Sequence, residues 1–166
     1  MSAKTGDQMT HTSTYESPIG LLYLSASQKG ISQISIEKIT HLKSNQSSKH
    51  LSDGKFALDR FFKCQNFELP SLDWNLCTMF QKKVLKQLCQ VKVGKTLSYG
   101  ELAEQINSPK AARAVGSCMR FNPWPLLVPC HRIIPASGAW GNYSLGGPDT
   151  KASLLEMEKT LNQSEI

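Results

Sequence analysis

The apolar residues near the start of the chain form short clusters of the kind that strands have. A run at 21–24 leads into a polar turn that ends at Gly30, and isoleucines then recur loosely up to residue 36, as in a half-buried strand. This pattern predicts a hairpin over residues 19–36.

The next segments alternate between polar and apolar character. Residues 40–55 are rich in Ser, Lys, His and Asn, which predicts a solvated loop, and residues 53–62 are predicted to form a helix. The apolar side of that helix is expected to consist of Phe56, Leu58, Phe61 and Phe62. A proline-containing linker follows at 67–74, so we place a domain boundary near residue 72, with an N-terminal domain over 1–72.

Two capping boxes mark helix starts in the C-terminal domain, residues 73–166. In each box a hydroxyl residue precedes a Glu or Gln by three positions: Thr78 with Gln81, and Ser98 with Glu101. Apolar residues follow both boxes at helical spacing. They are Phe80, Val84, Leu85 and Leu88 after the first box, and Leu102 and Ile106 after the second.

A third helix of this domain is predicted at 110–120, with Ser108 as its N-cap and Pro109 at its first position. Arg113 and Arg120 are seven residues apart and therefore lie on one face. Small residues occupy another side: Ala111, Ala112, Ala114 and Gly116. A helix, a short turn and a basic helix with small residues are typical of a helix-turn-helix that approaches DNA closely.

The apolar run at 127–134 contains three consecutive reactive or ionisable side chains, Cys130, His131 and Arg132. Such runs normally exclude ionisable groups. A thiolate is a strong nucleophile, and a neighbouring imidazole or cation lowers the pKa of the thiol. A buried structural cysteine is the alternative. Pro123 and Pro125 predict an extended backbone that leads into the segment with Cys130. In an extended segment adjacent side chains point to opposite faces, so His131 would reach the thiol of Cys130 through a water.

A last helix is predicted over 150–161, with Asp149 as its cap. Its apolar face is defined by Leu154, Leu155 and Leu161. Glu158 falls on that face, where a carboxylate is costly to bury unless it is paired. Two interpretations stay open. Glu158 either lies at the rim or pairs with an arginine such as Arg132, or it orients His131 as a base, which would complete a thiol–imidazole–carboxylate relay.

Composition limits the class of protein. The 166 residues are 40% hydrophobic and 19% charged, which suits a globular protein. No apolar stretch is long enough for a membrane span and the start is polar, so we expect an intracellular protein. The net charge of +6 favours a polyanionic partner. Five cysteines without Cys-x-x-Cys spacing argue against disulfides and zinc, and no metal or cofactor is predicted.

Several motifs together resemble those of the O6-alkylguanine-DNA alkyltransferases, also called methylated-DNA–protein-cysteine methyltransferases. The motifs are Tyr99-Gly-Glu-Leu-Ala103, Ala111-Ala-Arg-Ala-Val-Gly116, Met119-Arg-Phe-Asn-Pro123, Pro129-Cys-His-Arg132 and Gly141-Asn-Tyr-Ser144. Residues 17–24 are similar to the N-terminal hairpin of that family, and the strong resemblance covers about 73–160. It implies an α/β (α+β) fold: a small N-terminal antiparallel β-sheet domain with a helix, then a mainly helical, winged helix-turn-helix-like domain.

The function that this resemblance implies is DNA repair. The enzyme would act as a monomer, bind double-stranded DNA through the minor groove and flip the alkylated guanine out of the helix. It would then transfer the alkyl group irreversibly from O6-alkylguanine, or from O4-alkylthymine, to its own Cys130, once per molecule. Its compartment would be the cytoplasm in a prokaryote and the nucleus in a eukaryote.

The resemblance also implies residue roles. The catalytic set would be Cys130, His131, Glu158, Tyr99 and Asn122. Tyr99 would contact the phosphate or base and supply a proton to the leaving guanine, and Asn122 would brace the turn beside the cysteine. The DNA-binding set would be Ala111, Ala112, Arg113 and Arg120, with Arg113 filling the gap left by the flipped base. The substrate pocket would be lined or closed by Met119, Pro125, Ile133, Tyr143 and Ser144.

Three other functions compete with this one. A lesion-recognition protein would bind alkylated DNA without transfer, but relatives of that type carry tryptophan at the position of Cys130. A cysteine hydrolase would turn over and need an oxyanion hole, and the adjacent placement of Cys130 and His131 disfavours it. A plain DNA-binding regulator would leave the thiol in the apolar run and Glu158 unexplained.

Overall fold

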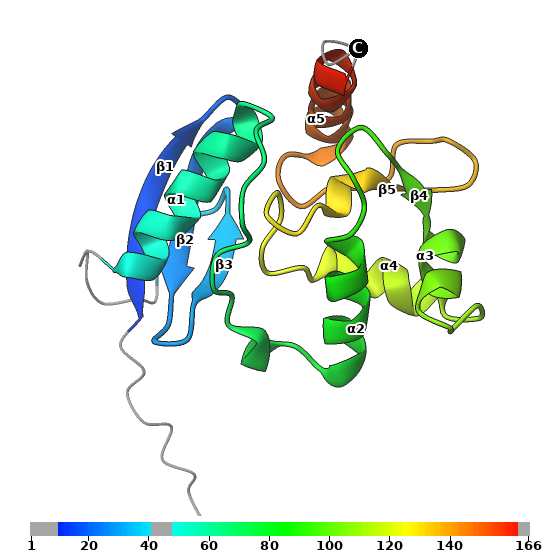
Figure 1. Ribbon diagram of the computed structural model, residues 1–166, viewed down its shortest axis with the longest axis horizontal. Helices are drawn as coiled ribbons and strands as arrows, with labels where there is room; N and C mark the ends of the chain where they lie inside the picture. Colours follow the sequence, from blue (N-terminus) through cyan, green and yellow to red (C-terminus); the bar gives the residue numbers. More distant parts are fainter. Residues whose placement is uncertain (1–9, 41–47, 163–166) are drawn as a thin grey trace, which may run out of the picture.

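The computed structural model describes residues 10–40 and 48–162, and it has two lobes (Figure 1). The N-terminal lobe is an antiparallel sheet of order β1-β2-β3, with α1 packed against one face. Its elements are β1 (His11–Ser17), β2 (Gly20–Ala26), β3 (Ile31–Ser35) and α1 (Lys49–Phe62). Leu22 and Leu24 of β2 and Leu58 of α1 are fully buried and belong to the core of this lobe. The predicted hairpin over 19–36 is confirmed.

In this lobe the sequence pattern misses one strand, and two predictions are wrong in detail. Strand β1 was not predicted, because its residues are mostly polar and show no apolar alternation. Helix α1 begins at Lys49, so the predicted loop 40–55 ends earlier than expected, and residues 41–47 lie outside the described part of the chain. Phe56 was expected on the apolar side of α1 but is 62% exposed, because Leu51 and Ala57 face the sheet instead.

The predicted linker lies along the edge of the sheet. The backbone N–H of Ile31 donates to the carbonyl of Ser71, and the N–H of Asp73 donates to the carbonyl of Ile31, over 2.8 and 2.9 Å. The chain then forms the short 3-10 helix η1 (Trp74–Leu76) and enters the second lobe. A boundary at residue 72 falls within this attached stretch and stays a prediction.

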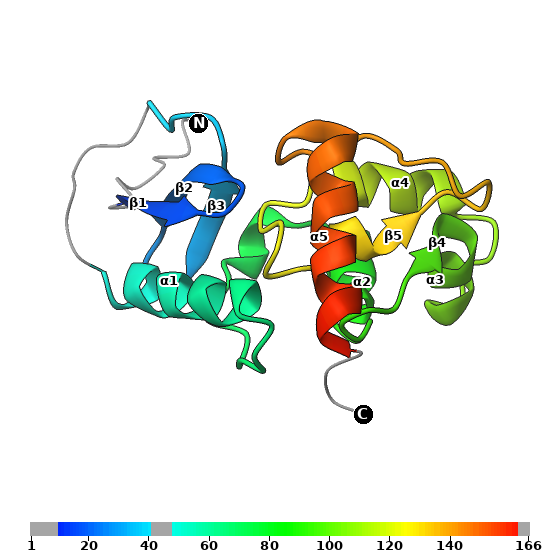
Figure 2. The same ribbon diagram turned by 90° about the horizontal axis from the view of Figure 1, so that it is seen from above.

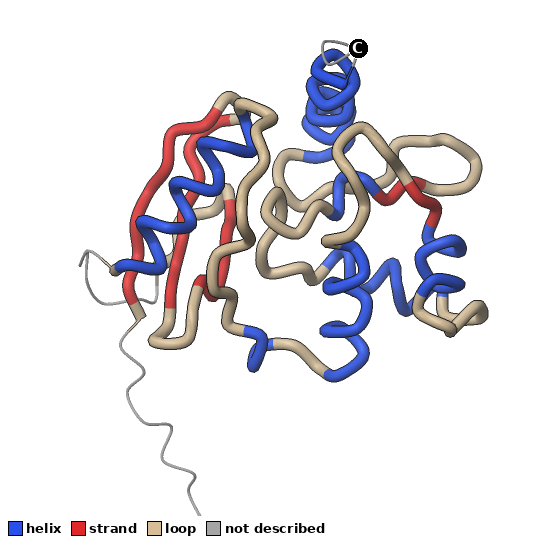
Figure 3. The backbone as a smooth tube through the Cα atoms, in the orientation of Figure 1, coloured by secondary structure: helices blue, strands red, loops and turns tan. Residues whose placement is uncertain are grey.

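The C-terminal lobe is mainly helical, with one short pair of parallel strands (Figure 3). Its elements are α2 (Met79–Leu88), β4 (Leu97–Ser98), α3 (Tyr99–Gln105), α4 (Ala112–Arg120), η2 (Cys130–Arg132), β5 (Ile133–Ile134) and α5 (Gly147–Asn162). Both capping boxes are present, with the predicted side-chain and backbone hydrogen bonds. The mixed α/β fold class is confirmed. No helix in the described ranges has the length and apolar character needed to cross a bilayer.

The starts of two helices differ from the prediction. Helix α4 begins at Ala112, and Ser108 does not cap it, because the chain first makes a turn closed by the N–H of Ala111 and the carbonyl of Ser108. Helix α5 begins at Gly147, so Asp149 lies within its first turn instead of capping it. The leucine predicted at 161 to complete the apolar face lies beyond the described side chains.

The two lobes share one buried core. Trp124 is fully buried, and its indole N–H donates to the carbonyl of Ile31 in β3 over 2.7 Å. The N–H of Ile34 donates to the carbonyl of Pro123 over 2.8 Å. Viewed from above, α5 lies on the side of the C-terminal lobe that faces the sheet and α1 (Figure 2). The segment that leads into Cys130 is therefore held by both lobes.

Candidate active site

Cys130 begins the one-turn 3-10 helix η2 and is only 4% exposed. The N–H of Arg132 donates to the carbonyl of Pro129 over 3.0 Å, which closes the turn. The prediction of an extended segment here is therefore wrong, because the chain turns as soon as it has left Pro129. In a tight turn consecutive side chains spread around an axis and do not alternate between two faces.

The turn is preceded by a loop that the side chain of Asn122 spans. Its amide nitrogen donates to the carbonyl of Val128 over 2.9 Å, and its amide oxygen accepts from the N–H of Trp124 over 3.0 Å. Asn122 is 6% exposed, so both bonds are shielded from water. This geometry suits the bracing role predicted for Asn122.

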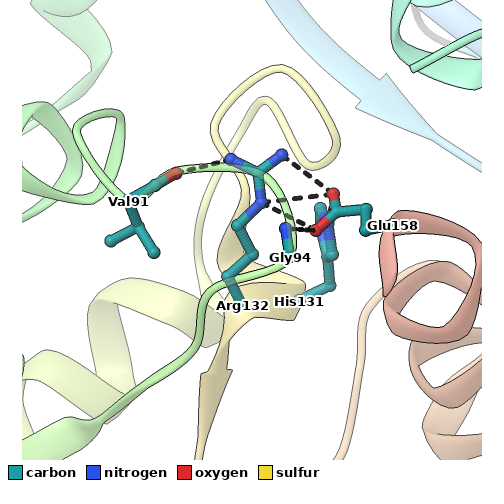
Figure 4. Close-up of polar contacts among 5 residues, drawn as sticks. All are labelled: Val91, Gly94, His131, Arg132 and Glu158. Carbon is teal, nitrogen blue, oxygen red and sulfur yellow. Dashed lines mark hydrogen bonds and ion pairs between the residues drawn. The ribbon is translucent and has the colours of Figure 1, made fainter. Parts of the chain in front are cut away.

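Glu158 lies at the centre of a buried polar cluster with His131 and Arg132 (Figure 4). One carboxylate oxygen, Oε1, lies 2.8 Å from Nε2 of His131 and 2.8 Å from the guanidinium Nη2 of Arg132. The other oxygen, Oε2, accepts from Nε of Arg132 over 3.0 Å and from the backbone N–H of Gly94 over 3.3 Å. Arg132 also donates to the carbonyl of Val91 over 2.6 Å. Glu158 is 1% exposed and therefore does not lie at the rim. It pairs with Arg132 and contacts His131, and its role in orienting His131 as a base stays a prediction.

The charges in this cluster fix the hydrogen on His131. Burial alone would raise the pKa of Glu158, but hydrogen bonds from His131 and Arg132 lower it to about 2, so the carboxylate is ionised and can only accept. Nε2 of His131 must then carry the hydrogen. Burial lowers the pKa of His131, although Glu158 acts in the opposite direction. The lowered pKa keeps the imidazole neutral. Its other nitrogen, Nδ1, is buried and has no hydrogen-bond partner in the structure, as a general base requires.

The thiol of Cys130 does not have the lowered pKa that the sequence predicted. Burial raises the pKa of this thiol, and the Asn122 amide, the Lys151 cation and two backbone N–H groups offset that effect only in part. The neighbouring imidazole is neutral and supplies no charge of its own. The thiolate is therefore expected to form during reaction, as a base removes the proton.

Tyr99 connects the site to the helix-turn-helix. It is the first residue of α3, and a Cβ added at Gly116 of α4 would lie 3.8 Å from its ring. Its hydroxyl is 3.6 Å from the position of a Cβ at Gly141, in the loop before α5. Burial and the nearby Cys130 raise the pKa of Tyr99, so its hydroxyl keeps a proton to donate. Tyr99 therefore lies between α4 and the loop before α5, next to both glycines.

The remaining predicted residues fall into two groups. The pocket residues Met119, Pro125, Ile133 and Tyr143 are buried, whereas Ser144 is exposed and lines a separate cavity of about 380 Å³ with Arg120, Asn122 and β3. On α4, Arg113 and Arg120 are exposed, and Ala111 and Ala112 beside them are partly exposed. The roles assigned to both groups stay predictions. Within residues 10–40 and 48–162, no three His, Cys, Asp or Glu side chains gather where they could hold a metal ion.

Known proteins resemble this chain over most of its length. Residues 79–160 match the family model described as 6-O-methylguanine DNA methyltransferase, DNA binding domain. The methylated-DNA–protein-cysteine methyltransferase of Mycobacterium leprae is 38% identical over 157 residues, covering 91% of this chain and 93% of the relative. The chain belongs to the methylated-DNA–protein-cysteine methyltransferase family.

Solved structures agree with this assignment. Mycobacterium tuberculosis OGT in complex with DNA is 36% identical, has a TM-score of 0.77, and is matched over 90% of this chain and 93% of its own. The O6-methylguanine-DNA methyltransferase of Pyrococcus kodakaraensis has a TM-score of 0.65 at 26% identity, over 90% of this chain and 99% of its own. This methyltransferase is therefore a DNA-repair enzyme that works by alkyl transfer.

One further buried ionisable residue of this methyltransferase, Lys151, lies close to the site and is not among the predicted site residues. Lys151 is 1% exposed, and its ammonium group donates to the carbonyl of Ile133 over 2.6 Å. It lies seven residues before Glu158 and three before Leu154, hence on the same face of α5. Lys151, like Glu158, is an ionisable residue on the apolar face of α5, so the helical period alone predicts its burial.

Proposed function

We propose that Cys130 accepts the alkyl group, that the substrate is O6-alkylguanine or O4-alkylthymine in double-stranded DNA, and that each molecule reacts once. The observation that carries this proposal is the buried series of thiol, imidazole and carboxylate. His131 directly follows Cys130, its Nε2 lies 2.8 Å from Glu158, and its Nδ1 is without a partner. Such a series provides a nucleophile, a base and a group that orients the base.

The reaction balances when the Tyr99 hydroxyl is added to these groups. Nδ1 of His131 takes the thiol proton of Cys130, through a water if the two do not touch. The sulfur then forms a bond to the saturated carbon on O6, and the carbon–oxygen bond breaks with its electron pair left on the purine. Tyr99 donates a proton to the purine and recovers one from His131. The alkyl group ends on sulfur, and the thiol proton ends on guanine.

The product explains why each molecule would react once. S-alkylcysteine is a thioether, and a thioether bound to a saturated carbon has no good leaving group at neutral pH. The thiol is not regenerated by simple hydrolysis, unlike the acyl-enzyme of a cysteine hydrolase. The amount of repaired DNA should therefore equal the amount of active protein.

Because Cys130 is buried, the alkylated DNA base must leave the duplex to reach it. The thiol is 4% exposed, so a base stacked in duplex DNA cannot reach it and must flip out of the helix. We propose that α4 enters the minor groove, with Ala111 and Ala112 allowing close approach and Arg113 in the gap left by the base. Arg120, on the same exposed side, and the net charge of +6 favour contact with phosphates. The protein would act as a monomer.

The test is the intact mass of the protein after incubation with duplex DNA that contains O6-methylguanine, followed by peptide mapping. We expect a gain of one methylene mass on Cys130 and no second turnover with excess DNA. Cys130→Ser should gain no mass but still bind DNA, whereas Cys118→Ser, which removes another buried thiol, should react normally. If wild-type protein binds the DNA without gaining mass, it is a lesion-recognition protein instead.

A further inference from the structure

We infer that Lys151 is a positioning residue of the transfer reaction: it fixes the strand that follows Cys130 and supplies the counter-charge of the thiolate. This inference rests on the proposed function, because it needs Cys130 to ionise. Lys151 lies outside the predicted catalytic, DNA-binding and pocket sets.

The burial of Lys151 needs an explanation. Its side chain is among the largest that are fully buried in the chain, and lysine is rarely buried without a partner. Its hydrogen bond goes to a neutral group, the carbonyl of Ile133. No carboxylate of the described residues forms an ion pair with it, and Glu158 on the same face is engaged by Arg132 and His131. A charge held in this way contributes little to folding, which points to a function.

The position of Lys151 links it to the nucleophile. Ile133 directly follows the η2 turn, and its backbone N–H donates to the carbonyl of Cys130. Helix α5 packs against this turn, and it brings the ammonium group to the strand just after the thiol. Lys151 therefore acts on the same short segment that carries the sulfur.

The electrostatics agree with this geometry. Burial raises the pKa of Cys130 and lowers that of Lys151, and each group offsets part of the effect on the other. The other groups that interact with the thiol are the Asn122 amide, the Tyr99 and Tyr143 hydroxyls, and the backbone N–H groups of Cys130 and His131. These groups and the neighbouring His131 imidazole are uncharged before proton transfer, so Lys151 is the cation that acts on the thiol among the described residues.

Lys151 would then act mainly in the transition state. The resting thiol is neutral and gains little from a nearby cation, whereas the thiolate is strongly stabilised by one in a site without water. After transfer the thioether is neutral again. A buried ion can often be replaced by an apolar residue of similar size without loss of stability. Removal of the Lys151 charge should therefore slow transfer without weakening the fold.

The experiment compares full-length Lys151→Met with Lys159→Met, which removes the same charge from an exposed position of α5. The second-order rate of methyl transfer from O6-methylguanine duplex is measured across neutral and alkaline pH, together with the thermal midpoint. For Lys151→Met we expect a loss of about tenfold or more at neutral pH, roughly tenfold per unit of thiol pKa. The rate should recover as the pH rises, with an unchanged or higher thermal midpoint. Lys159→Met should match the wild type.

A second variant separates the charge from the hydrogen bond. Lys151→Gln keeps an N–H donor for the carbonyl of Ile133 but carries no charge. Its pH–rate profile should therefore show the same shift to alkaline pH as that of Lys151→Met. This variant also provides the test if Lys151→Met does not fold. A wild-type pH profile in Lys151→Gln, or an equal loss of rate at every pH, would overturn the inference. The two failures are distinguishable: if the wild type itself gains no methyl group, the proposed function fails, whereas normal transfer with unaltered variant profiles refutes the role of Lys151 alone.

Discussion

The carboxylate of Glu158 holds three parts of the chain together. It accepts hydrogen bonds from His131 and Arg132 in the η2 turn and from Gly94 in the loop after α2, while it is itself part of α5. A buried carboxylate of this kind is stable only because several donors replace its water. Burial raises its pKa, but the donors lower it from 4.5 to about 2. Its contribution to stability is therefore present above about pH 4.5 and is lost as the pH falls toward 2.

Replacement of Glu158 by glutamine tests this dependence. Glu158→Gln leaves the guanidinium of Arg132 buried without its counter-charge, which should cost about 3–5 kcal/mol of unfolding free energy at neutral pH. Urea unfolding measures the free energy of unfolding of both proteins. The difference between the variant and the wild type should become smaller between about pH 5 and pH 2, because the wild-type carboxylate becomes protonated there. Glu156→Gln, at an exposed position of the same helix, should change neither quantity.

The same variant tests the relay. Without the carboxylate, His131 loses the group that orients it and stabilises its protonated form, so the apparent pKa of Cys130 should rise in the alkylation pH profile. A profile identical to that of the wild type would mean that Glu158 is purely structural.

At the level of elements, the helices were predictable because their signals are local. Two capping boxes gave the starts of α2 and α3, and the inward position of Glu158 in α5 follows from a helical period of 3.6 residues. Strand β1 was not predictable in this way, because a mostly polar strand is defined by its partner β2 and not by its own pattern. The η2 turn was missed for a similar reason, since its shape depends on Asn122 and Val128 in the preceding loop.

The site was predictable to the extent that its residues broke a local pattern. Cys130, His131 and Glu158 stood out as polar groups in apolar surroundings, and the structure brings His131 and Glu158 into contact. The raised pKa of the thiol was not predictable, because it depends on burial by segments distant in sequence. Lys151 carries a local signal of the same kind as Glu158, because both are ionisable residues on the apolar face of α5.

The proposed role of α4 leads to a test at this scale. Arg113 is exposed near the start of α4, beside small residues. Its side chain can therefore enter the DNA duplex and fill the gap that the flipped base leaves. Arg113→Ala should slow methyl transfer from duplex DNA far more than reaction with free O6-methylguanine, because only the duplex requires flipping. The ratio of the two rates is the measurement, and Arg120→Ala serves as a comparison that removes a charge from the other end of α4. Equal losses on both substrates would remove the flipping role of Arg113.

At the scale of the molecule, the N-terminal lobe forms part of the wall of the site. Phe61 of α1 packs edge-on against the His131 ring, with centroids 5.6 Å apart and planes at 84°. Tyr143 contacts the same imidazole, with centroids 6.3 Å apart. The His131 imidazole is thus enclosed by residues of both lobes. The two lobes should therefore unfold together rather than as independent domains.

Trp124 offers a way to test this coupling. Trp124→Phe removes the indole hydrogen bond to Ile31 and should cost about 1–3 kcal/mol of unfolding free energy. Far-ultraviolet circular dichroism and fluorescence should still report one shared urea transition, at lower urea than in the wild type. Trp140→Phe, which changes a tryptophan that is 46% exposed, should leave the midpoint in place. Two separate transitions in either protein would show that the lobes are independent.

Alkylation should change the stability of the whole molecule. Cys130 is 4% exposed in a close-packed core, so a methyl group on its sulfur must displace neighbouring atoms, at a cost of about 1–3 kcal/mol. For a chain of this size each kcal/mol lowers the thermal midpoint by about 2–4 °C. The measurement is the midpoint of wild-type protein before and after stoichiometric reaction with O6-methylguanine DNA, with the DNA then removed by nuclease. The thermal midpoint of Cys130→Ser should not change when this variant is taken through the same steps. An unchanged midpoint in fully methylated protein would mean that the site has room for the added methyl group.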